Sequence, residues 1–200
     1  MLNNPAARKL ASGVIEPPAR LLNRLGVSPD AVTIIGTVGV VIASLACFTT
    51  GRFVLGVVLI AAFAISDLID GTMARLRGSS GPWGNFLDAT LDRLADGAIF
   101  GSLIVWAALN DQPWIAAAAS AALVTGQVTS YAKARAEAVG ATANVGIAER
   151  AERNMGVLLA VLLTGLGVPY VLAVALWLLA ILGVITIAQR ILVVRSQLKG

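Results

Sequence analysis

The chain has 200 residues, of which 58% are hydrophobic and only 13% are charged, and its net charge is +4. This composition excludes an ordinary soluble domain and indicates an all-α, polytopic membrane protein made of one domain, residues 1–200. Histidine is absent and Cys47 is the only cysteine, which excludes catalysis by a histidine base, thiolate metal clusters and disulfides within one chain.

Residues 1–27 are predicted to form an amphipathic helix that lies at the membrane interface. Basic and apolar residues are interspersed there: Arg8, Lys9, Leu10, Val14, Ile15, Arg20, Leu21, Leu22, Arg24 and Leu25. Pro17 and Pro18 predict a bend or break, because proline lacks the amide donor and clashes with the preceding turn. No apolar stretch with a small-residue cleavage site follows the first basic residues, so we expect no removable signal peptide.

Residues 28–200 are predicted to form a bundle of six transmembrane helices. The expected spans are residues 31–50, 53–75, 84–110, 113–137, 147–168 and 170–194. The fifth span has the shortest apolar part, and Gly165, Gly167 and Pro169 separate it from the sixth.

The distribution of basic residues predicts the orientation of these spans. Every Lys and Arg except Arg52 lies before the first span, around the second or fourth connection, or at the end of the chain from Arg190 onward. By the positive-inside rule, both termini and those two connections face the cytoplasm. We therefore expect a multi-pass protein of the plasma membrane, whose positive charge reflects orientation and contact with anionic lipid or substrate rather than with nucleic acid.

Four aspartates stand out in this apolar chain, because a charged carboxylate near the centre of a bilayer costs roughly 2.5 to 3.5 kcal/mol. From Asp67 to Asp92 the sequence reads D-x2-D-G-x2-A-R-x8-G-x3-D-x3-D. Asp67 and Asp70 are spaced i, i+3, and Asp88 and Asp92 are spaced i, i+4, so each pair shares one helix face.

Two facing helices that each present two carboxylates would form a site for one or two divalent cations, because hard cations prefer oxygen ligands. The small residues Gly71, Ala74 and Gly84 would allow these helices to approach closely. The alternative is a polar loop in which the aspartates cap helices or form salt bridges. The regular spacing favours the metal site, with all four aspartates as ligands.

The aspartate motif resembles the signature of the CDP-alcohol phosphotransferase family at every defined position. The resemblance implies a membrane enzyme that breaks the pyrophosphate of a CDP-linked lipid, transfers the phosphatidyl or a related group to an alcohol and releases CMP. Such a substrate implies two Mg²⁺ ions, with Mn²⁺ as the alternative, held by the four aspartates. The resemblance also makes Asp92 the catalytic residue, which accepts the proton of the incoming hydroxyl.

Further residues are expected to bind the CDP-linked lipid. Family members carry a segment similar to Ser28–Thr33, which implies that Asp30 and Thr33 contact the CDP moiety, although Ser28 and Pro29 also suit a plain helix start. Gly71 would let the nucleotide approach the backbone, and Arg75 could pair with phosphate. The link after the second span would cradle the nucleotide through Ser80 and Gly81.

Basic residues near the ends of the fourth, fifth and sixth spans suit an acceptor that carries its own phosphate. These residues are Lys133, Arg135, Arg150, Arg153 and Arg190. The segments Ser130–Glu137 and Glu149–Arg153, together with Gln189-Arg190, resemble the actinobacterial phosphatidylinositol phosphate synthases. This resemblance implies transfer from CDP-diacylglycerol to inositol phosphate, whose phosphate these basic residues would hold.

Two other functions stay open. Phosphatidylglycerophosphate synthesis would use glycerol 3-phosphate, another phosphorylated acceptor. A divalent-metal transporter would also place carboxylates within the membrane. Transporters built from repeats should show matching halves, whereas all four motif aspartates lie in residues 1–100.

The helix that carries Asp88 and Asp92 has two further features. Asp96 continues their face outside the motif, and we expect it to accept a hydrogen bond or to pair with a basic residue. Gly97 and Gly101 form a small-x3-small pattern typical of helix packing, which together with the family resemblance predicts a homodimer.

Overall fold

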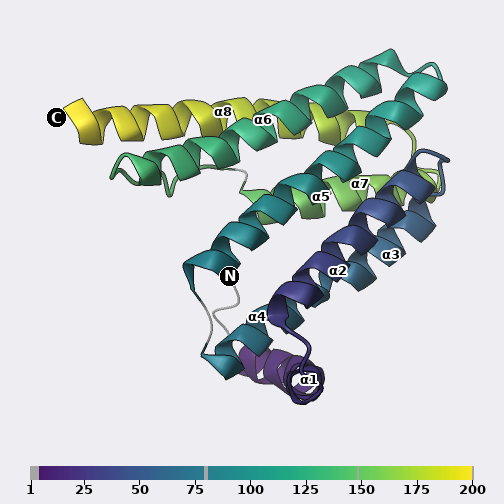
Figure 1. Cartoon of the computed structure of the whole chain (residues 1–200). Coiled ribbons are helices and arrows are strands. Elements are labelled where there is room, and N and C mark those ends of the chain that lie inside the picture. Colours follow the sequence, from purple (N-terminus) through teal and green to yellow (C-terminus); the bar gives the residue numbers. More distant parts are fainter. Residues whose placement is uncertain (1–4, 79–80, 148, 200) are drawn as a thin grey trace. The chain divides into compact units, whose positions relative to one another are not determined.

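The structure, a computed structural model, describes residues 5–78, 81–147 and 149–199, with side chains from residue 13 onward. In this part of the chain every regular element is a helix (Figure 1). In order they are α1 (Pro5–Arg24), α2 (Pro29–Ala43), the π-helical η1 (Ser44–Phe48), α3 (Phe53–Ala64), α4 (Ser66–Arg77), α5 (Pro82–Leu109), α6 (Pro113–Ala138), α7 (Arg150–Gly165) and α8 (Val171–Lys199). The predicted all-α fold is confirmed, and each predicted span corresponds to one helix or to two consecutive ones.

Three helical stretches among the described residues are long and apolar enough to cross a membrane. They are Pro29–Phe48, Phe53–Arg77 and Val171–Lys199. Many of their large apolar side chains are exposed, as Ile35 and Ile42 are on α2, and hydrocarbon is a favourable surrounding for such surfaces. The chain is therefore a membrane protein, whereas the crossing of all six predicted spans and the cytoplasmic position of the termini stay predictions.

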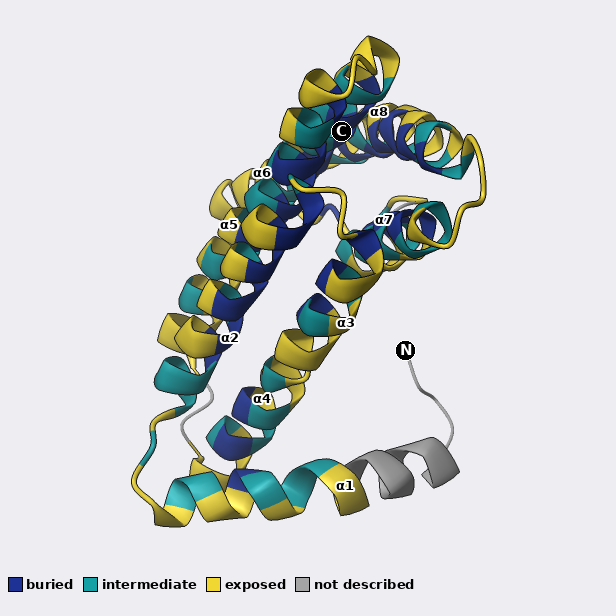
Figure 2. Ribbon diagram, turned by 90° about the vertical axis from the view of Figure 1, so that its right-hand side faces the viewer, coloured by how far each residue is buried: buried dark blue, intermediate teal, exposed yellow. Residues whose placement is uncertain are grey.

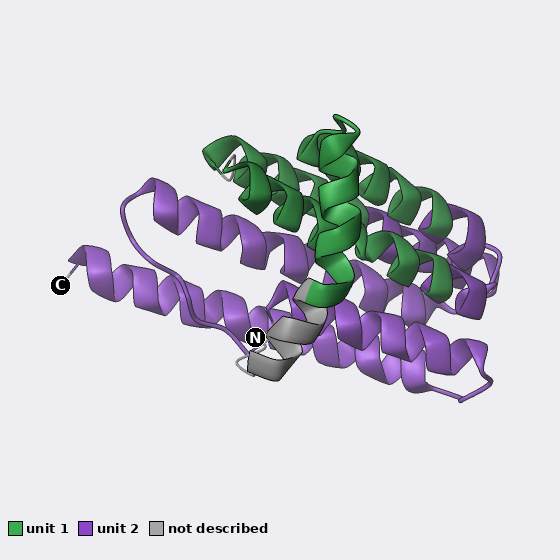
Figure 3. Cartoon of the chain, turned by 90° about the horizontal axis from the view of Figure 1, so that it is seen from below, with its two compact units in different colours: residues 1–43, 58–95 green, residues 44–57, 96–200 purple. Residues whose placement is uncertain are grey.

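The chain divides into two compact units, which Figure 3 shows in separate colours. Unit 1 comprises residues 1–43 and 58–95, and unit 2 comprises residues 44–57 and 96–200. The motif aspartates belong to unit 1, whereas the basic residues expected at the acceptor belong to unit 2. The organisation as one membrane domain stays a prediction.

In unit 1, α2 packs closely against the chain around the junction of α3 and α4 through two glycines. The buried residues of α2 recur every three or four positions on one side of the helix (Figure 2): Thr33, Gly36, Gly39, Val40 and Ala43. A Cβ atom at Gly36 would lie 1.7 Å from Ser66 Oγ, and one at Gly39 would lie 2.3 Å from a ring carbon of Phe63. Only glycine permits this close approach.

The helix predicted over residues 53–75 is interrupted once, at Ile65 between α3 and α4. The Ser66 hydroxyl donates a hydrogen bond to the carbonyl of Phe63 (2.6 Å). A side-chain donor of this kind competes with the regular backbone pattern of a helix, and the contact with Gly36 leaves Ser66 little room to turn away. As a result, α4 begins directly before Asp67.

We expect Gly36→Ala to destabilise the protein by about 1 to 3 kcal/mol, because the new methyl group overlaps Ser66, including its backbone-fixed Cβ atom. Thermal unfolding of the purified protein in detergent measures the change. Gly156→Ala on α7 is the matched control, because a Cβ atom there would be 3.7 Å from Leu179, an ordinary contact. Equal losses of stability for the two variants would contradict the packing described for α2.

α1 is a single helix through Pro17 and Pro18, so a break at these prolines is wrong. The two carbonyls that lose an amide partner belong to Gly13 and Val14, which are exposed residues where other donors can solvate them. Arg20 Nε donates to Glu16 Oε1 (2.9 Å), and this ion pair bridges the two prolines across one helical turn.

Hydrogen bonds attach the C-terminal end of α1 to α4. Asn23 Nδ2 donates to the carbonyl of Met73 (3.3 Å), and Arg77 Nη2 donates to the carbonyl of Asn23 (3.4 Å) and to that of Val27, just after the helix (2.7 Å). Ala19 is fully buried on the same helix. The N-terminal helix is therefore a fixed part of unit 1.

In unit 2, α8 packs against α6 and α7. Gly183 of α8 makes room for Thr125 of α6, since a Cβ atom at this glycine would lie 2.5 Å from Thr125 Oγ1. The Phe53 ring packs edge-on against Trp106, with 4.9 Å between the ring centroids. These contacts hold together the helices that carry the basic residues.

Candidate active site

The four motif aspartates lie on two helices of unit 1, with Asp67 and Asp70 on α4 and Asp88 and Asp92 on α5. Asp70 is buried, with 8% of its surface exposed, whereas Asp67 and Asp88 are exposed and Asp92 is partly buried. The charges of Asp67 and Asp88 are close enough to act repulsively on Asp70. The structure therefore gathers negative charge from both helices around one buried carboxylate.

The chemistry of this cluster fits a divalent cation. Asp67 and Asp88 act repulsively on the buried Asp70 carboxylate, and a hard cation would relieve that repulsion while using oxygen ligands. Among the described residues, no three Asp, Glu or Cys side chains are grouped so that they could hold a metal ion. The metal-binding role of the four aspartates and the catalytic role of Asp92 stay predictions.

Asp30 and Thr33, which were expected to contact CDP, both make hydrogen bonds within unit 1. Thr33 donates its hydroxyl to Asp70 Oδ2, so it orients the buried carboxylate. Trp83 Nε1 donates to Asp30 Oδ2 (2.8 Å). Sequence reasoning missed this use of Trp83, and its place directly after Pro82, just before the second half of the motif, was the only available signal.

The other described residues expected at the CDP-linked lipid are Gly71, Arg75 and Gly81. A Cβ atom at Gly71 would meet no atom within 4 Å, so nothing in the structure blocks an approach to the backbone there. Arg75 is exposed and donates to Thr72 Oγ1 (3.0 Å). Gly81 is exposed, whereas Ser80 lies outside the described residues. Nucleotide binding by these residues stays a prediction.

Asp96 lies at the centre of a buried polar cluster in unit 2, where it accepts hydrogen bonds from neighbouring side chains. With only 2% exposure, it accepts hydrogen bonds from Arg153 Nη2 and Asn154 Nδ2, both at 2.9 Å, and Arg150 Nε lies 3.5 Å from it. Gly126 of α6 makes room for the Arg153 guanidinium, since a Cβ atom there would lie 2.8 Å from Arg153 Cζ. The prediction that Asp96 pairs with a basic residue is confirmed.

Arg190 is buried and joins three parts of unit 2. It donates from Nε to the carbonyl of Val145 (2.9 Å) and from Nη1 to the carbonyl of Thr129 (2.6 Å). Glu149 is close enough to attract it electrostatically. These contacts connect α8 with α6 and with the segment before α7.

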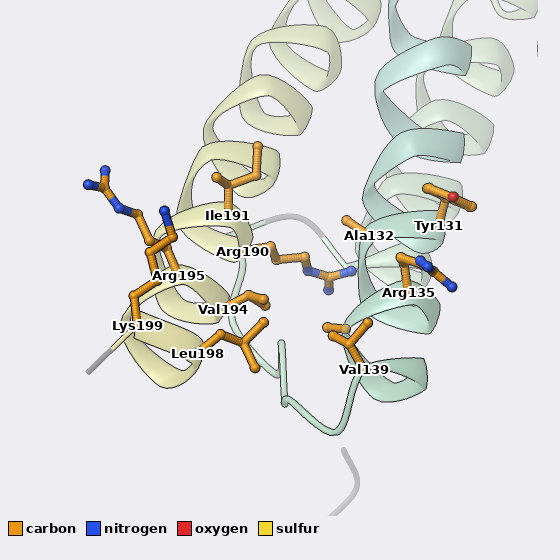
Figure 4. Close-up of a pocket in the computed structure, with 11 residues that line it drawn as sticks. Tyr131, Ala132, Arg135, Val139, Arg190, Ile191, Val194, Arg195, Leu198 and Lys199 are labelled. Atoms are coloured by element: carbon orange, nitrogen blue, oxygen red, sulfur yellow. The ribbon is translucent and has the colours of Figure 1, made fainter.

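Arg135 and Arg190 also line a cavity of 380 Å³ between α6 and α8 (Figure 4). Its other lining residues are Tyr131, Ala132, Ala136, Val139, Ile191, Val194, Arg195, Leu198 and Lys199. In Figure 4 the Arg190 side chain extends from α8 toward α6.

The five expected acceptor residues thus have different surroundings. Arg150 and Arg153 meet at Asp96, Arg135 and Arg190 line the cavity, and Lys133 is partly buried on α6.

Sequence reasoning missed two members of the Asp96 cluster. Asn154 follows Arg153 directly at the start of an apolar helix, which was a usable signal, whereas Gly126 in an alanine-rich helix gave none.

The sequence matches a known family and several named relatives. The model of the family described as CDP-alcohol phosphatidyltransferase matches residues 26–189. A phosphatidylinositol phosphate synthase of Streptomyces avermitilis is 43% identical over 202 residues, which cover 97% of this chain and 83% of the relative. Another, from Corynebacterium glutamicum, is 44% identical over 189 residues, which cover 92% of this chain and 85% of the relative.

Solved structures agree with these sequence matches. The crystal structure of Mycobacterium tuberculosis phosphatidylinositol phosphate synthase (PgsA1) with CDP-DAG bound has a TM-score of 0.87 and 41% identity, and covers 92% of this chain and 94% of that one. The structure of PgsA1 in complex with manganese and citrate has the same TM-score and identity, and covers 92% of this chain and 90% of that one.

Proposed function

The chain belongs to the CDP-alcohol phosphatidyltransferase family, and we propose that it transfers the phosphatidyl group of CDP-diacylglycerol to the hydroxyl of inositol phosphate, giving phosphatidylinositol phosphate and CMP. The observation that carries this proposal is the placement of the four motif aspartates on α4 and α5 of unit 1, with Asp70 buried and hydrogen-bonded by Thr33. Relatives named phosphatidylinositol phosphate synthase, each more than 40% identical, support inositol phosphate as the acceptor.

In the proposed reaction, Asp92 accepts the proton of the acceptor hydroxyl as its oxygen attacks the phosphorus that carries diacylglycerol. A new phosphorus–oxygen bond forms and the bond to the CMP oxygen breaks, so CMP leaves with the electron pair. Asp67, Asp70, Asp88 and Asp92 hold divalent cations, which neutralise charge on the pyrophosphate. Two Mg²⁺ ions are proposed, with Mn²⁺ able to replace them, in line with the manganese complex of PgsA1.

The CDP-linked lipid is proposed to bind beside this cluster. Gly71 leaves room for the nucleotide, and Arg75 supplies a cation for its phosphates. Ser80 and Gly81 would contact the nucleotide from the connection after α4. Thr33 orients Asp70 through its hydroxyl. Asp30, in the first turn of α2, is proposed to contact the CDP moiety.

The acceptor phosphate is proposed to bind basic residues of unit 2. Among the described residues, Lys133 and Arg135 on α6 form no ion pair with a carboxylate, whereas Arg153 shares its guanidinium with Asp96. Arg150 lies further from Asp96, at 3.5 Å, and has more freedom to turn toward an anion. Arg190 on α8 is proposed as a further cation for the acceptor phosphate, and its hydrogen bond to the carbonyl of Thr129 holds it close to α6.

We further propose a homodimer in the plasma membrane, with six membrane crossings per chain and an active site that opens to the cytoplasm. The asymmetric distribution of Lys and Arg supports this orientation. At Gly97 and Gly101 a Cβ atom would meet nothing within 4 Å, so this small-residue face is available for a second copy.

One assay tests the acceptor. With CDP-diacylglycerol and Mg²⁺ supplied, we expect CMP release to be fastest with inositol phosphate among inositol phosphate, inositol, glycerol 3-phosphate and serine. We also expect Lys133→Gln or Arg135→Gln to raise the KM for inositol phosphate about tenfold or more, because each removes a charge-assisted contact, with little change in the KM for CDP-diacylglycerol.

Arg52→Gln, which removes an exposed cation from the connection before α3, is the matched control and should leave both KM values unchanged. A preference for glycerol 3-phosphate would assign the chain to phosphatidylglycerophosphate synthesis. Metal uptake into vesicles without any turnover of CDP-diacylglycerol would favour a transporter instead.

A further inference from the structure

The cavity between α6 and α8 has a mainly apolar lining. Its volume of 380 Å³ is within the range of small-molecule sites, and its apolar lining residues are Ala132, Ala136, Val139, Ile191, Val194 and Leu198. Val139, Ile191 and Leu198 are exposed, so the cavity is open on one side. A polyhydroxylated acceptor needs polar partners for its hydroxyl groups, which such walls cannot supply.

Three basic residues are among those that line this apolar cavity. Arg135 comes from α6, whereas Arg195 and Lys199 come from α8 (Figure 4), and no acidic residue is among its described lining residues. All three are exposed, so their aliphatic stems can line the cavity. In Figure 4 the charged ends of Arg195 and Lys199 point away from α6, and as exposed, flexible side chains they have room to turn toward an anion at the rim. Arg190 is already bound to two carbonyls and forms part of the wall.

We propose that this cavity binds an anionic phospholipid of the surrounding bilayer. One acyl chain enters between α6 and α8, and the phosphate lies at the rim beside Arg195, Lys199 and Arg135. The pairing of an apolar slot with three cations is complementary to such a lipid, and basic pockets between membrane helices are typical sites for anionic headgroups. Arg135 and Arg190 are shared with the acceptor site under the proposed function, whereas Arg195 and Lys199 have no role there, so these two residues distinguish a lipid site from the acceptor site.

Native mass spectrometry of the full chain in a neutral detergent tests the rim. Dioleoylphosphatidylglycerol, dioleoylphosphatidylcholine and glycerol 3-phosphate are titrated in turn. We expect phosphatidylglycerol to bind about tenfold more tightly than phosphatidylcholine, and the double variant Arg195→Gln/Lys199→Gln to lose that advantage. Arg52→Gln is the matched control and should keep it. In neutral micelles the double variant should release CMP at the normal rate, which separates this site from the proposed reaction.

A second variant tests the apolar part. Ala132→Phe fills the cavity and should reduce the retention of both lipids, whereas Ala117→Phe, at an exposed position of the same helix, should not. Equal affinity for the two lipids, unchanged phosphatidylglycerol binding by the rim variant, or an equal loss in Arg52→Gln would overturn the proposal. So would displacement of phosphatidylglycerol by glycerol 3-phosphate at similar concentration, because that result would indicate a site for a free anion.

Discussion

Asp70→Asn is expected to lower CMP release by about a hundredfold or more while the protein stays folded. Asp70 is the buried member of the aspartate cluster, with Asp67 and Asp88 close enough to repel it. The amide removes one negative ligand from the proposed cation site but keeps the size of the side chain and can still accept the hydrogen bond from Thr33. Asp67→Asn and Asp88→Asn should have the same effect.

Direct titration of Mn²⁺ into each variant, followed by electron paramagnetic resonance, should show weaker metal binding alongside the loss of turnover. Asp111→Asn, at an exposed position in unit 2, is the control for the substitution and should behave as the unaltered chain does. If any of the three variants kept normal turnover at saturating Mg²⁺, the metal-ligand role of that aspartate would be wrong.

Asp96→Asn is expected to destabilise the protein by about 3 to 5 kcal/mol, because it leaves the buried Arg153 guanidinium without its counter-charge. Asp96 and Arg153 have side chains only 2% and 4% exposed, so water cannot replace the lost partner. Chemical denaturation of the detergent-solubilised protein measures the change.

The double variant Asp96→Asn/Arg153→Gln should recover part of this loss, because neither buried charge is then left unpaired. Asp111→Asn again provides the matched control, since asparagine tolerates the positive φ of 53° found at that residue as well as aspartate does. If Asp96→Asn and Asp111→Asn had the same unfolding midpoint, the buried pair would contribute little to stability.

The helices could be predicted from the sequence because apolar runs end at residues that stop helices. The fourth span was expected to begin at Pro113, and α6 begins there. The interruption at Ile65 could not be predicted, because it depends on how Gly36 of another helix meets Ser66. The helical path through Pro17 and Pro18 was also missed, since their carbonyl partners lie on exposed residues.

The candidate site likewise has features that could be predicted from the sequence and features that could not. The spacing of the motif aspartates is local, so their positions on two helices followed from the sequence. The partners of the polar side chains did not, because Thr33 and Asp70 are 37 residues apart and Asp96 and Arg153 are 57 apart. Such pairings depend on tertiary packing, which periodicity does not encode.

The attachment of α1 to α4 links membrane mechanics to the aspartate cluster. Val14 and Leu21 on α1 expose 73% and 57% of their surfaces, and such exposed apolar side chains suit the predicted position of this helix at the membrane interface. Its C-terminal end is fixed by Asn23 and Arg77 to α4, the helix that carries Asp70. With α1 at the interface as predicted, a displacement of this helix would pass through these hydrogen bonds to α4, the helix that positions the buried carboxylate.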